Sequence, residues 1–208
     1  MRSYNQYCGL AKALDVVGDR WTLLIVRELL TGPKRYTDLQ NGLPGIATNL
    51  LADRLTDLEQ AELVQREEAP PPVATTLYSL TPRGAELRPV IQELGRWARP
   101  LMGQLARGEK FLGRWLALPA ELFLADRSPK RPPIAIEVHS GDESIVIETA
   151  DGVIRARAGT VNDADAVITA RPDLALSLLL GRVELPAARA RGLKFEGDPK
   201  VLQRLKPV

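Results

Sequence analysis

Apolar residues recur at helical spacing in the first half of the chain, in short segments that glycine and proline separate. This spacing predicts helices at 10–17, 21–30 and 46–63, and a short helical turn at 36–42. The longest helix has one apolar stripe, which we expect to be buried and which consists of Ile46, Leu50, Leu51, Leu55 and Leu58.

The first two helices are expected to form the floor of a small domain. On the first helix, Leu10, Leu14 and Val17 are predicted to face inward. Asp19 follows the glycine that ends this helix, so it is predicted to cap the next one. The apolar positions of that second helix are Trp21, Leu24, Ile25, Leu29 and Leu30.

A hairpin is predicted after the longest helix. Its strands are 63–66 and 75–80, and the prolines at 70–72 between them cannot donate hydrogen bonds to a ladder. Thr81 and Pro82 then begin another helix, as N-cap and first helical residue. The order helix, turn, helix, hairpin, helix is that of a winged helix-turn-helix, whose second helix enters the DNA major groove.

The second half alternates apolar and polar residues, which is the pattern of half-buried strands. An Asp-Gly pair at 151–152 predicts a hairpin turn, and a leucine-rich helix at 172–180 ends at Gly181. Helical character over 111–125 is interrupted by Pro119. Strands are expected at 134–139, 144–148, 153–157, 166–170 and 193–196, with a last helix at 200–205.

The 208 residues suffice for two modest domains that each bury a core. The periodic pattern loosens near 103–113, so we place the boundary there. The sequence therefore predicts an α+β chain. A winged helix-turn-helix over 1–107 is followed by a small α+β domain over 108–208 with a mostly antiparallel sheet.

Composition and charge narrow the class of protein. No apolar run approaches the roughly 20 residues of a membrane-spanning helix, and the N-terminus lacks a signal-peptide pattern. A single cysteine permits no internal disulfide, so we expect a cytoplasmic protein without membrane partners. The net charge is only +2, and any DNA contact must depend on where a few cations lie.

Seven fragments of the first half form an ordered set. They are Cys8-Gly9, Gly18-Asp19-Arg20-Trp21, Arg35-Tyr36-Thr37-Asp38-Leu39, Pro44-Gly45-Ile46, Arg54-Leu55-Thr56-Asp57-Leu58-Glu59, Leu63-Val64-Gln65-Arg66 and Tyr78-Ser79-Leu80-Thr81-Pro82-Arg83-Gly84. Over residues 4–100 the set resembles the HxlR-type winged-helix regulators, bacterial dimeric transcription factors related to MarR. The resemblance implies a homodimer, paired through the N-terminal segment and the helix from Thr81 to about Leu105.

That helix carries an apolar stripe wider than a small domain needs. The stripe consists of Leu87, Val90, Ile91, Leu94, Trp97 and Leu101. Pro89 and Pro100 lie in the same stretch and are expected to kink or divide the helix. An exposed stripe of this size usually has a partner, so we predict a dimer interface. Alternatively, Trp97 fills the space between the two domains of one chain.

The second helix of the motif carries the candidates for reading bases. Thr48 and Asn49 lie near its start, where this motif reaches base edges, and asparagine pairs bidentately with adenine. Lys34 and Arg35 precede the first motif helix and are predicted to contact phosphates, which sets register without reading sequence. The alternative is that these are capping or solvated surface groups.

Asp53 and Arg54 lie one turn further along and complete the DNA-binding candidates on this helix. Arg54 either contacts a phosphate or forms a surface ion pair with Asp57 or Glu62, which would contribute about 0–1 kcal/mol. The sequence does not separate these two interpretations.

The wing departs from the family pattern. Its tip, 67–75, has no lysine or arginine, and the carboxylates of Glu67 and Glu68 oppose phosphate. Arg66 or Arg83 would therefore have to supply any contact of the wing with the DNA backbone.

The second half resembles a different family. The successive strands, the Asp-Ala-Val-Ile-Thr-Ala run at 165–170, the leucine-rich helix and the segment 192–198 are together similar to sterol-carrier-protein-like domains, over residues 110–206. The resemblance implies a hydrophobic or amphipathic small-molecule ligand. The pocket candidates are Trp115, Leu122, Phe123, Leu174, Leu178, Leu179 and Phe195. The same side chains would look identical if they were plain core.

Cys8 matches the position at which some HxlR-type proteins carry a redox- or electrophile-sensing thiol. The cations Arg2, Lys12 and Arg20 would lower its pKa if they lie close in space. The alternative is a small apolar residue in a dimer seam. In the sensing hypothesis, oxidation links two protomers through Cys8.

No catalytic site, metal site or cofactor is predicted. His139 is the only histidine and lies far from Cys8 in the sequence, so zinc-ligand spacing is absent. Neither a nucleophile elbow nor a nucleotide-binding motif occurs. Glu137, Glu143 and Glu148 are interpreted as the solvated sides of strands.

The sequence thus predicts a dimeric transcriptional regulator of a double-stranded DNA operator. An apolar effector in the C-terminal domain would change the separation of the two DNA-reading helices, which requires it to favour one dimer geometry over another. The alternative is that this domain is a lipid carrier or a structural interaction module without effect on DNA binding.

Overall fold

The long amphipathic helix of the first half is α4 (Thr48–Gln60). Of its predicted stripe, four side chains are buried and Leu50 is half-buried. The helix ends earlier than predicted because Glu62 has a left-handed backbone, with φ of 57°. The Leu63 N–H then donates to the Leu58 carbonyl over 2.9 Å, which is the closing bond of a Schellman motif.

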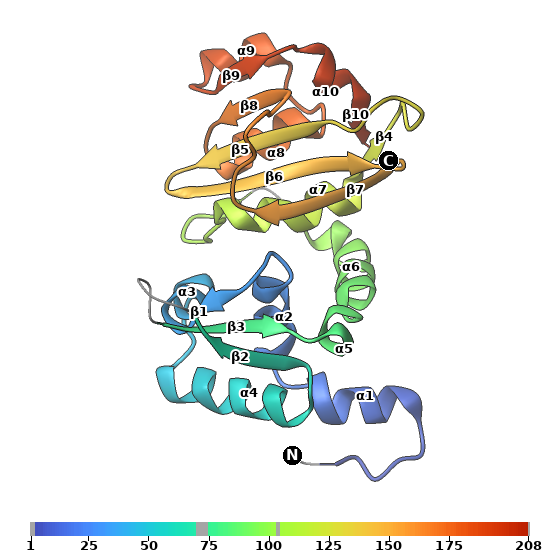
Figure 1. Cartoon of the computed structure of the whole chain (residues 1–208), viewed down its shortest axis with the longest axis vertical. Helices are drawn as coiled ribbons and strands as arrows, with labels where there is room; N and C mark the ends of the chain where they lie inside the picture. The colour runs from blue at the N-terminus through green and yellow to red at the C-terminus, as the bar shows by residue number, and fades with distance from the viewer. Residues whose placement is uncertain (1–2, 70–74, 103–104, 208) are drawn as a thin grey trace. The chain divides into compact units, whose positions relative to one another are not determined.

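A computed structural model describes residues 3–69, 75–102 and 105–207. The chain divides into two units, Met1–Leu94 and Gly95–Val208 (Figure 1). This division falls inside a helix that lies before the boundary expected from the sequence.

The first unit contains a helix-turn-helix and a wing. Its elements are α1 (Gly9–Val17), α2 (Thr22–Leu29), β1 (Lys34–Arg35), α3 (Tyr36–Gly42), α4, β2 (Val64–Glu68), β3 (Thr76–Leu80), α5 (Pro82–Ala85) and α6 (Arg88–Trp97). The three strands form an antiparallel sheet in the order β1-β3-β2. Helices α3 and α4 are the two motif helices, β2 and β3 are the wing, and the prolines predicted at its tip lie outside the described residues.

Two expectations about the first helices are wrong. Leu10 and Leu14 are exposed, because only Ala11 and Val17 of α1 reach the core of the unit. Asp19 does not cap α2; the N-cap residue is Trp21, without a side-chain cap, and the Asp19 carboxylate pairs with Arg54 instead.

The start of the helix after the wing is confirmed. The Thr81 hydroxyl accepts the Gly84 N–H over 3.1 Å and donates to the Glu62 carbonyl over 2.6 Å. Gly84 packs so close that a Cβ there would lie 2.0 Å from the Leu63 carbonyl oxygen. The predicted long helix is divided into α5, α6 and a 3₁₀ turn, η1 (Arg99–Leu101), and both prolines lie in first turns, where no N–H is needed.

The second unit is built on a five-stranded sheet with the order β7-β6-β5-β8-β9. Its strands are β5 (Ala135–Ser140), β6 (Glu143–Ala150), β7 (Val153–Ala158), β8 (Ala166–Thr169) and β9 (Lys194–Gly197). Only the β5–β8 pair is parallel, which confirms the mostly antiparallel α+β prediction.

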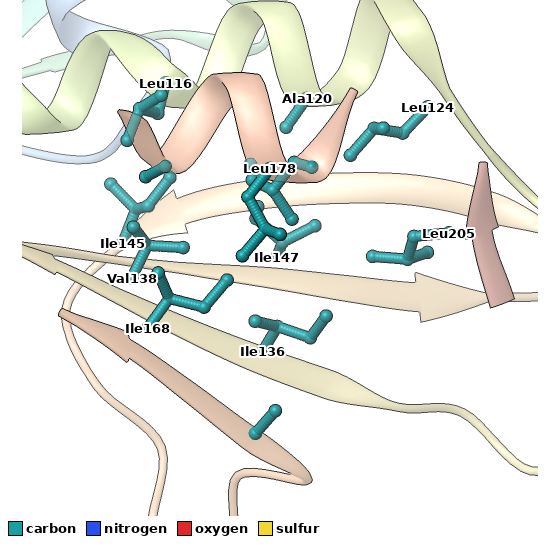
Figure 2. Close-up of a cluster of buried hydrophobic side chains, with 14 of the residues drawn as sticks. Leu116, Ala120, Leu124, Ile136, Val138, Ile145, Ile147, Ile168, Leu178 and Leu205 are labelled. Carbon is teal, nitrogen blue, oxygen red and sulfur yellow. The ribbon is translucent and has the colours of Figure 1, made fainter. Parts of the chain in front are cut away.

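Helices cover one face of this sheet. They are η2 (Gly113–Leu116), α7 (Ala117–Phe123), α8 (Pro172–Leu179), α9 (Leu185–Ala190) and α10 (Lys200–Arg204). Figure 2 shows Leu116, Ala120 and Leu178 from the helices opposite isoleucines and a valine of the strands. Pro119 does not interrupt α7, because it lies in the first turn.

The sequence did not indicate a second, two-stranded sheet, which joins β4 (Leu124–Asp126) to β10 (Leu205–Pro207). The Arg204 guanidinium donates two 2.8 Å hydrogen bonds to the buried Asp126 carboxylate. These bonds hold the pKa of Asp126 below its usual value, with help from the Ser128 N–H and against the effect of burial. The ion pair therefore fixes the end of the chain to the strand before the main sheet.

Candidate nucleic-acid interface and ligand cleft

The side of α4 opposite its buried stripe is polar and open to solvent. Thr48, Asn49 and Asp53 are exposed there. The Thr48 hydroxyl accepts from the Gln40 amide over 2.8 Å, and the Thr48 carbonyl accepts from the Tyr36 hydroxyl over 2.6 Å. Burial raises the pKa of Tyr36, so its phenol stays protonated as a donor. These bonds fix the start of α4 on α3.

Arg54 lies between two carboxylates of its own unit. It pairs with Asp19 at the α1–α2 turn and with Asp57 one turn along α4, the latter over 3.2 Å. The ion pair with Asp57 is one of the two interpretations that the sequence left open. The Arg54 Nε is buried and has no hydrogen-bond partner among the described residues. The two ion pairs use the terminal nitrogens of the guanidinium, so its charge is paired within the protein.

The other cations predicted to contact DNA lie on the three-stranded sheet of the first unit. Lys34 and Arg35 form β1, where the sequence predicted a turn, and they pair in register with Tyr78 and Leu77 of β3. Arg35 is exposed at the N-cap of α3 and its N–H donates to Asp38 over 3.2 Å.

Arg66 belongs to the wing strand β2. Its side chain is exposed, and its Nε lies 3.4 Å from a carboxylate oxygen of Glu59 on α4. This contact ties the base of the wing to the helix.

Helix α6 leaves most of its apolar side chains uncovered. Val90 and Leu94 are each 46 % exposed and Trp97 is 74 % exposed, and Leu101 in η1 is also exposed. Ile91 is buried within the chain and Leu87 is half-buried. Near the N-terminus, Tyr4, Tyr7, Leu10 and Leu14 are exposed as well.

Cys8 is the N-cap residue of α1 and is exposed. The nearby backbone N–H groups of Ala11 and Leu10 lower the pKa of its thiol below the ordinary value. A thiolate at this position is therefore favoured by the first turn of the helix.

The predicted pocket residues of the second unit form packed structure. Leu174, Leu178, Leu179 and Phe195 belong to the core between sheet and helices. Leu122 is buried on α7, and Trp115 and Phe123 are half-buried. The choice between pocket and plain core stays a prediction for these residues, four of which lie in the buried cluster.

An open cleft of about 590 Å³ lies at one end of the sheet. It is bounded by the segment before η2, the β5–β6 turn, the β8–α8 turn and the start of β9. The lining residues are Phe111, Leu112, Gly113, Ser140, Gly141, Asp142, Glu143, Thr169, Ala170, Arg171, Pro172, Gly192 and Lys194. Sequence reasoning missed them because they lie at the ends of elements, where apolar periodicity carries no signal.

The other face of the sheet carries a hydrogen-bonded row. The Glu137 carboxylate lies 2.8 Å from His139 Nε2, and His139 Nδ1 lies 2.8 Å from the Ser144 hydroxyl. The expectation that Glu137 is solvated is wrong, because the loop after β7 covers it and the Val161 N–H donates to it over 2.6 Å. Glu143 and Glu148 are half-buried and paired with Arg114 and Arg157.

The described residues carry neither a metal cluster nor a membrane-spanning helix. No group of three or more histidine, cysteine or acidic side chains gathers there as a metal site. None of the helices described is both long enough and apolar enough to cross a membrane.

Comparisons with known proteins match the two halves separately. The model of the HxlR-like helix-turn-helix family matches residues 16–105, and that of the SCP-2 sterol transfer family matches residues 130–208. The HTH-type transcriptional regulator YodB of Bacillus subtilis is 38% identical over 89 residues, which are 43% of this chain and 80% of YodB. An uncharacterised HTH-type regulator of Mycobacterium bovis, Mb3122, is 31% identical over 134 residues, 64% of this chain and 78% of Mb3122. The crystal structure of quinone-bound YodB is 37% identical, covers 44% of this chain and 96% of that one, and has a TM-score of 0.38.

Proposed function

The chain belongs to the HxlR-like helix-turn-helix family of transcriptional regulators, and from this premise we propose that it binds a double-stranded operator as a homodimer. Each protomer lays α4 into the major groove, and the two half-sites lie about one helical turn or a multiple apart. The observation that supports this most is the polar, exposed face of α4, with its buried stripe on the opposite side. Because the proposed operator is part of bacterial DNA, we place the protein in the cytoplasm.

The exposed residues of α4 have complementary tasks in this proposal. The Asn49 amide pairs with an adenine edge, and the Asp53 carboxylate accepts from the amino group of a cytosine. The Thr48 hydroxyl already accepts from Gln40, which leaves its proton to donate. Lys34, Arg35 and Arg66 contact phosphates and set the register of the helix. These phosphate contacts give the binding its salt dependence.

Arg54 positions the recognition helix in this proposal. Its two carboxylate partners leave little free charge for a phosphate, and Asp19 connects it to the turn that follows α1. A change in the orientation of α1 would therefore reach α4 through this ion pair.

Dimerisation is proposed to cover the exposed side chains of α6 and η1. Val90, Leu94, Trp97 and Leu101 supply the apolar area, and Leu87 lies at its edge. Aromatic side chains of this kind carry much of the binding energy in protein interfaces, so Trp97 is the proposed centre. Ile91 contributes to the core of its own protomer.

The SCP-2-type unit is proposed to bind a small-molecule effector that favours one dimer geometry. We assign it no reaction, and give the row of Glu137, His139 and Ser144 the task of holding the loop through Val161. If the bound molecule left operator affinity unchanged, the unit would instead be a carrier or an interaction module.

A second sensing function is proposed for Cys8. The observation in its favour is an exposed thiol at a helix N-terminus, whose pKa is lowered by two backbone N–H groups. Oxidation then links two protomers. Non-reducing electrophoresis after mild peroxide treatment tests this, with Cys8→Ser as control, and a monomer band alone from the unmodified protein would end the idea.

The operator contact is tested with one variant and a control on the same helix. An operator is first selected from random duplexes with the unmodified protein, and its affinity is then measured by gel shift. Asn49→Ala is expected to bind the operator about 1–3 kcal/mol more weakly. Gln60 is exposed at the other end of α4, so Gln60→Ala should bind it as tightly as the unmodified protein. Equal affinities of Asn49→Ala and the unmodified protein would refute the assignment.

A further inference from the structure

We propose that Gln40, on the first helix of the motif, determines which bases the operator can present to Thr48. Gln40 is a positioning residue in this role, because it acts on the Thr48 hydroxyl and not on the DNA itself. The role rests on the proposed contact of α4 with the operator. It adds a side chain of α3 to those that decide the operator sequence.

Two side chains of α3 hold the start of α4. Tyr36 and Gln40 are four positions apart and therefore lie on the same face of α3. The Tyr36 hydroxyl donates to the Thr48 carbonyl over 2.6 Å, and the Gln40 amide nitrogen donates to the Thr48 hydroxyl oxygen over 2.8 Å. Thr48 is the first residue of α4, so both bonds reach the end of the helix at which this motif reads bases.

Gln40 is held by the protein, and Thr48 is open to a ligand. Leu39 and Leu43 are buried in the core of the unit, which fixes the backbone on both sides of Gln40. Gln40 itself is half-buried, whereas Thr48 is exposed. The direction of the amide is therefore set by the fold, and the hydroxyl to which it donates faces solvent.

The Gln40 bond sets what the Thr48 hydroxyl offers to a base. A hydroxyl has one proton and two lone pairs, and an amide nitrogen can only donate. The bond therefore uses a lone pair of the Thr48 oxygen and leaves its proton for an acceptor outside the protein. Among the described residues, the Gln40 amide is the one partner of this hydroxyl.

The free proton distinguishes cytosine from the other bases. In the major groove, guanine, adenine and thymine each present an acceptor, whereas cytosine presents an amino donor. A cytosine at this place would leave the Thr48 proton unpaired once water is excluded, which is unfavourable. Thr48 should therefore disfavour cytosine at the position that it reads, as long as Gln40 donates to it.

The test selects operators from random duplexes with the full chain and with Gln40→Glu. A carboxylate can only accept, so this change draws the Thr48 proton towards residue 40 and leaves lone pairs facing the base. The unmodified protein is expected to disfavour cytosine about ten-fold at one position of each half-site. Gln40→Glu should prefer cytosine or adenine there by about the same factor, with the other positions unchanged. Gln60→Glu adds the same charge at the exposed far end of α4 and, as the matched control, should keep the original preference.

Three further variants separate positioning from folding and from direct contact. Gln40→Met keeps the approximate size without the donor, and it should relax the preference at this position to near equality while the thermal unfolding midpoint shows that the protein is folded. In Thr48→Val the preference should be lost, and adding Gln40→Glu should not restore or change it. Tyr36→Phe should weaken all sequences alike by a few-fold, because Tyr36 holds the carbonyl and not the hydroxyl.

Selection of the same bases by Gln40→Glu and by the unmodified protein would overturn the role of Gln40 and leave the operator contact of α4 standing. An effect of Gln40→Glu that persists in Thr48→Val would overturn it too, because Gln40 would then act on the DNA directly. Failure of the unmodified protein to enrich any operator would overturn the proposed function and this role together.

Discussion

Helices α6 and α8 both carry apolar residues at helical spacing, and only α8 is covered by its own chain. On α8, Leu174, Leu178 and Leu179 pack on the strands of the C-terminal sheet. On α6, a single side chain is buried, and Trp97 is three-quarters exposed. The difference comes from what each helix packs against. Strands β5 to β8 supply isoleucines and a valine to the core that α8 joins, whereas Ile91 is the one buried residue of α6.

The comparison shows what an apolar stripe does and does not establish. The sequence permits two interpretations of each stripe. That of α8 lines a pocket or belongs to the core, and that of α6 forms a dimer interface or fills the space between domains. Both stripes have helical periodicity; the coverage that separates them depends on residues far away in the chain. Five predictions sharpen or break the contrast between the self-covered helix and the uncovered one.

The largest effect is expected at the ion pair that closes the C-terminal unit. Asp126→Asn should lower the free energy of unfolding of this unit by about 3–5 kcal/mol, because it leaves the buried Arg204 guanidinium without its counter-charge. Urea unfolding at neutral pH measures it, with Asp142→Asn as an exposed control.

The same pair predicts a pH dependence. The pKa of Asp126 is lowered in the folded state, so its stabilisation is complete above about pH 4, the unfolded value, and is lost as the pH falls further through the folded value. The unmodified protein should therefore lose more stability between pH 5 and acid than Asp126→Asn does. Parallel pH profiles of the two proteins would contradict this.

The next effect is a cavity on the self-covered helix. Leu174→Ala should destabilise the C-terminal unit by about 2–5 kcal/mol, because the side chain is 2 % exposed in a close-packed core. Thermal unfolding at several protein concentrations measures it. The loss should not depend on concentration, since α8 is covered within one chain; a loss that grows on dilution would break the contrast.

Trp97→Ala should act in the opposite manner. It should leave the stability of the units nearly unchanged and weaken the dimer by about 2–4 kcal/mol, which is roughly 30-fold or more in Kd. Sedimentation equilibrium measures the Kd. An unchanged Kd would favour the alternative in which Trp97 lies between the domains of one chain.

The smallest effect comes from a matched pair of valines. Val90 on α6 and Val153 on β7 are both 46 % exposed. Val90→Ala should weaken dimerisation by about 1 kcal/mol, several-fold in Kd, and Val153→Ala should not change it. Equal Kd values for the two variants would contradict the assignment of the α6 stripe to the dimer interface.

Much of the fold followed from local chemistry. The Thr81 cap, the Asp-Gly turn and the stripe of α4 depend on neighbours in the sequence, and their elements appear as predicted. The end of α4 was missed because the left-handed Glu62 is not a residue that propensity favours there.

The sites were harder to predict than the elements. Asp19 lies 35 positions from its partner Arg54, and Val161 lies 24 positions from Glu137, so no spacing rule could find these two contacts. The cleft depends on four element ends that meet only once the sheet is formed, and the residues that line it belong to no motif. The proposed DNA-reading residues follow from the position and the exposed face of one helix, which the local sequence pattern predicts.

The central claim is that two copies of the chain act together on one duplex, with the α6 stripe covered between them. Sedimentation of the protein with its selected operator, at concentrations near the binding midpoint, measures this most directly. The account predicts a complex of two 22.8 kDa chains per duplex, and separate, weak binding of single chains after Trp97→Ala. A single chain that binds the operator with full affinity, and stays single in free solution, would contradict the account.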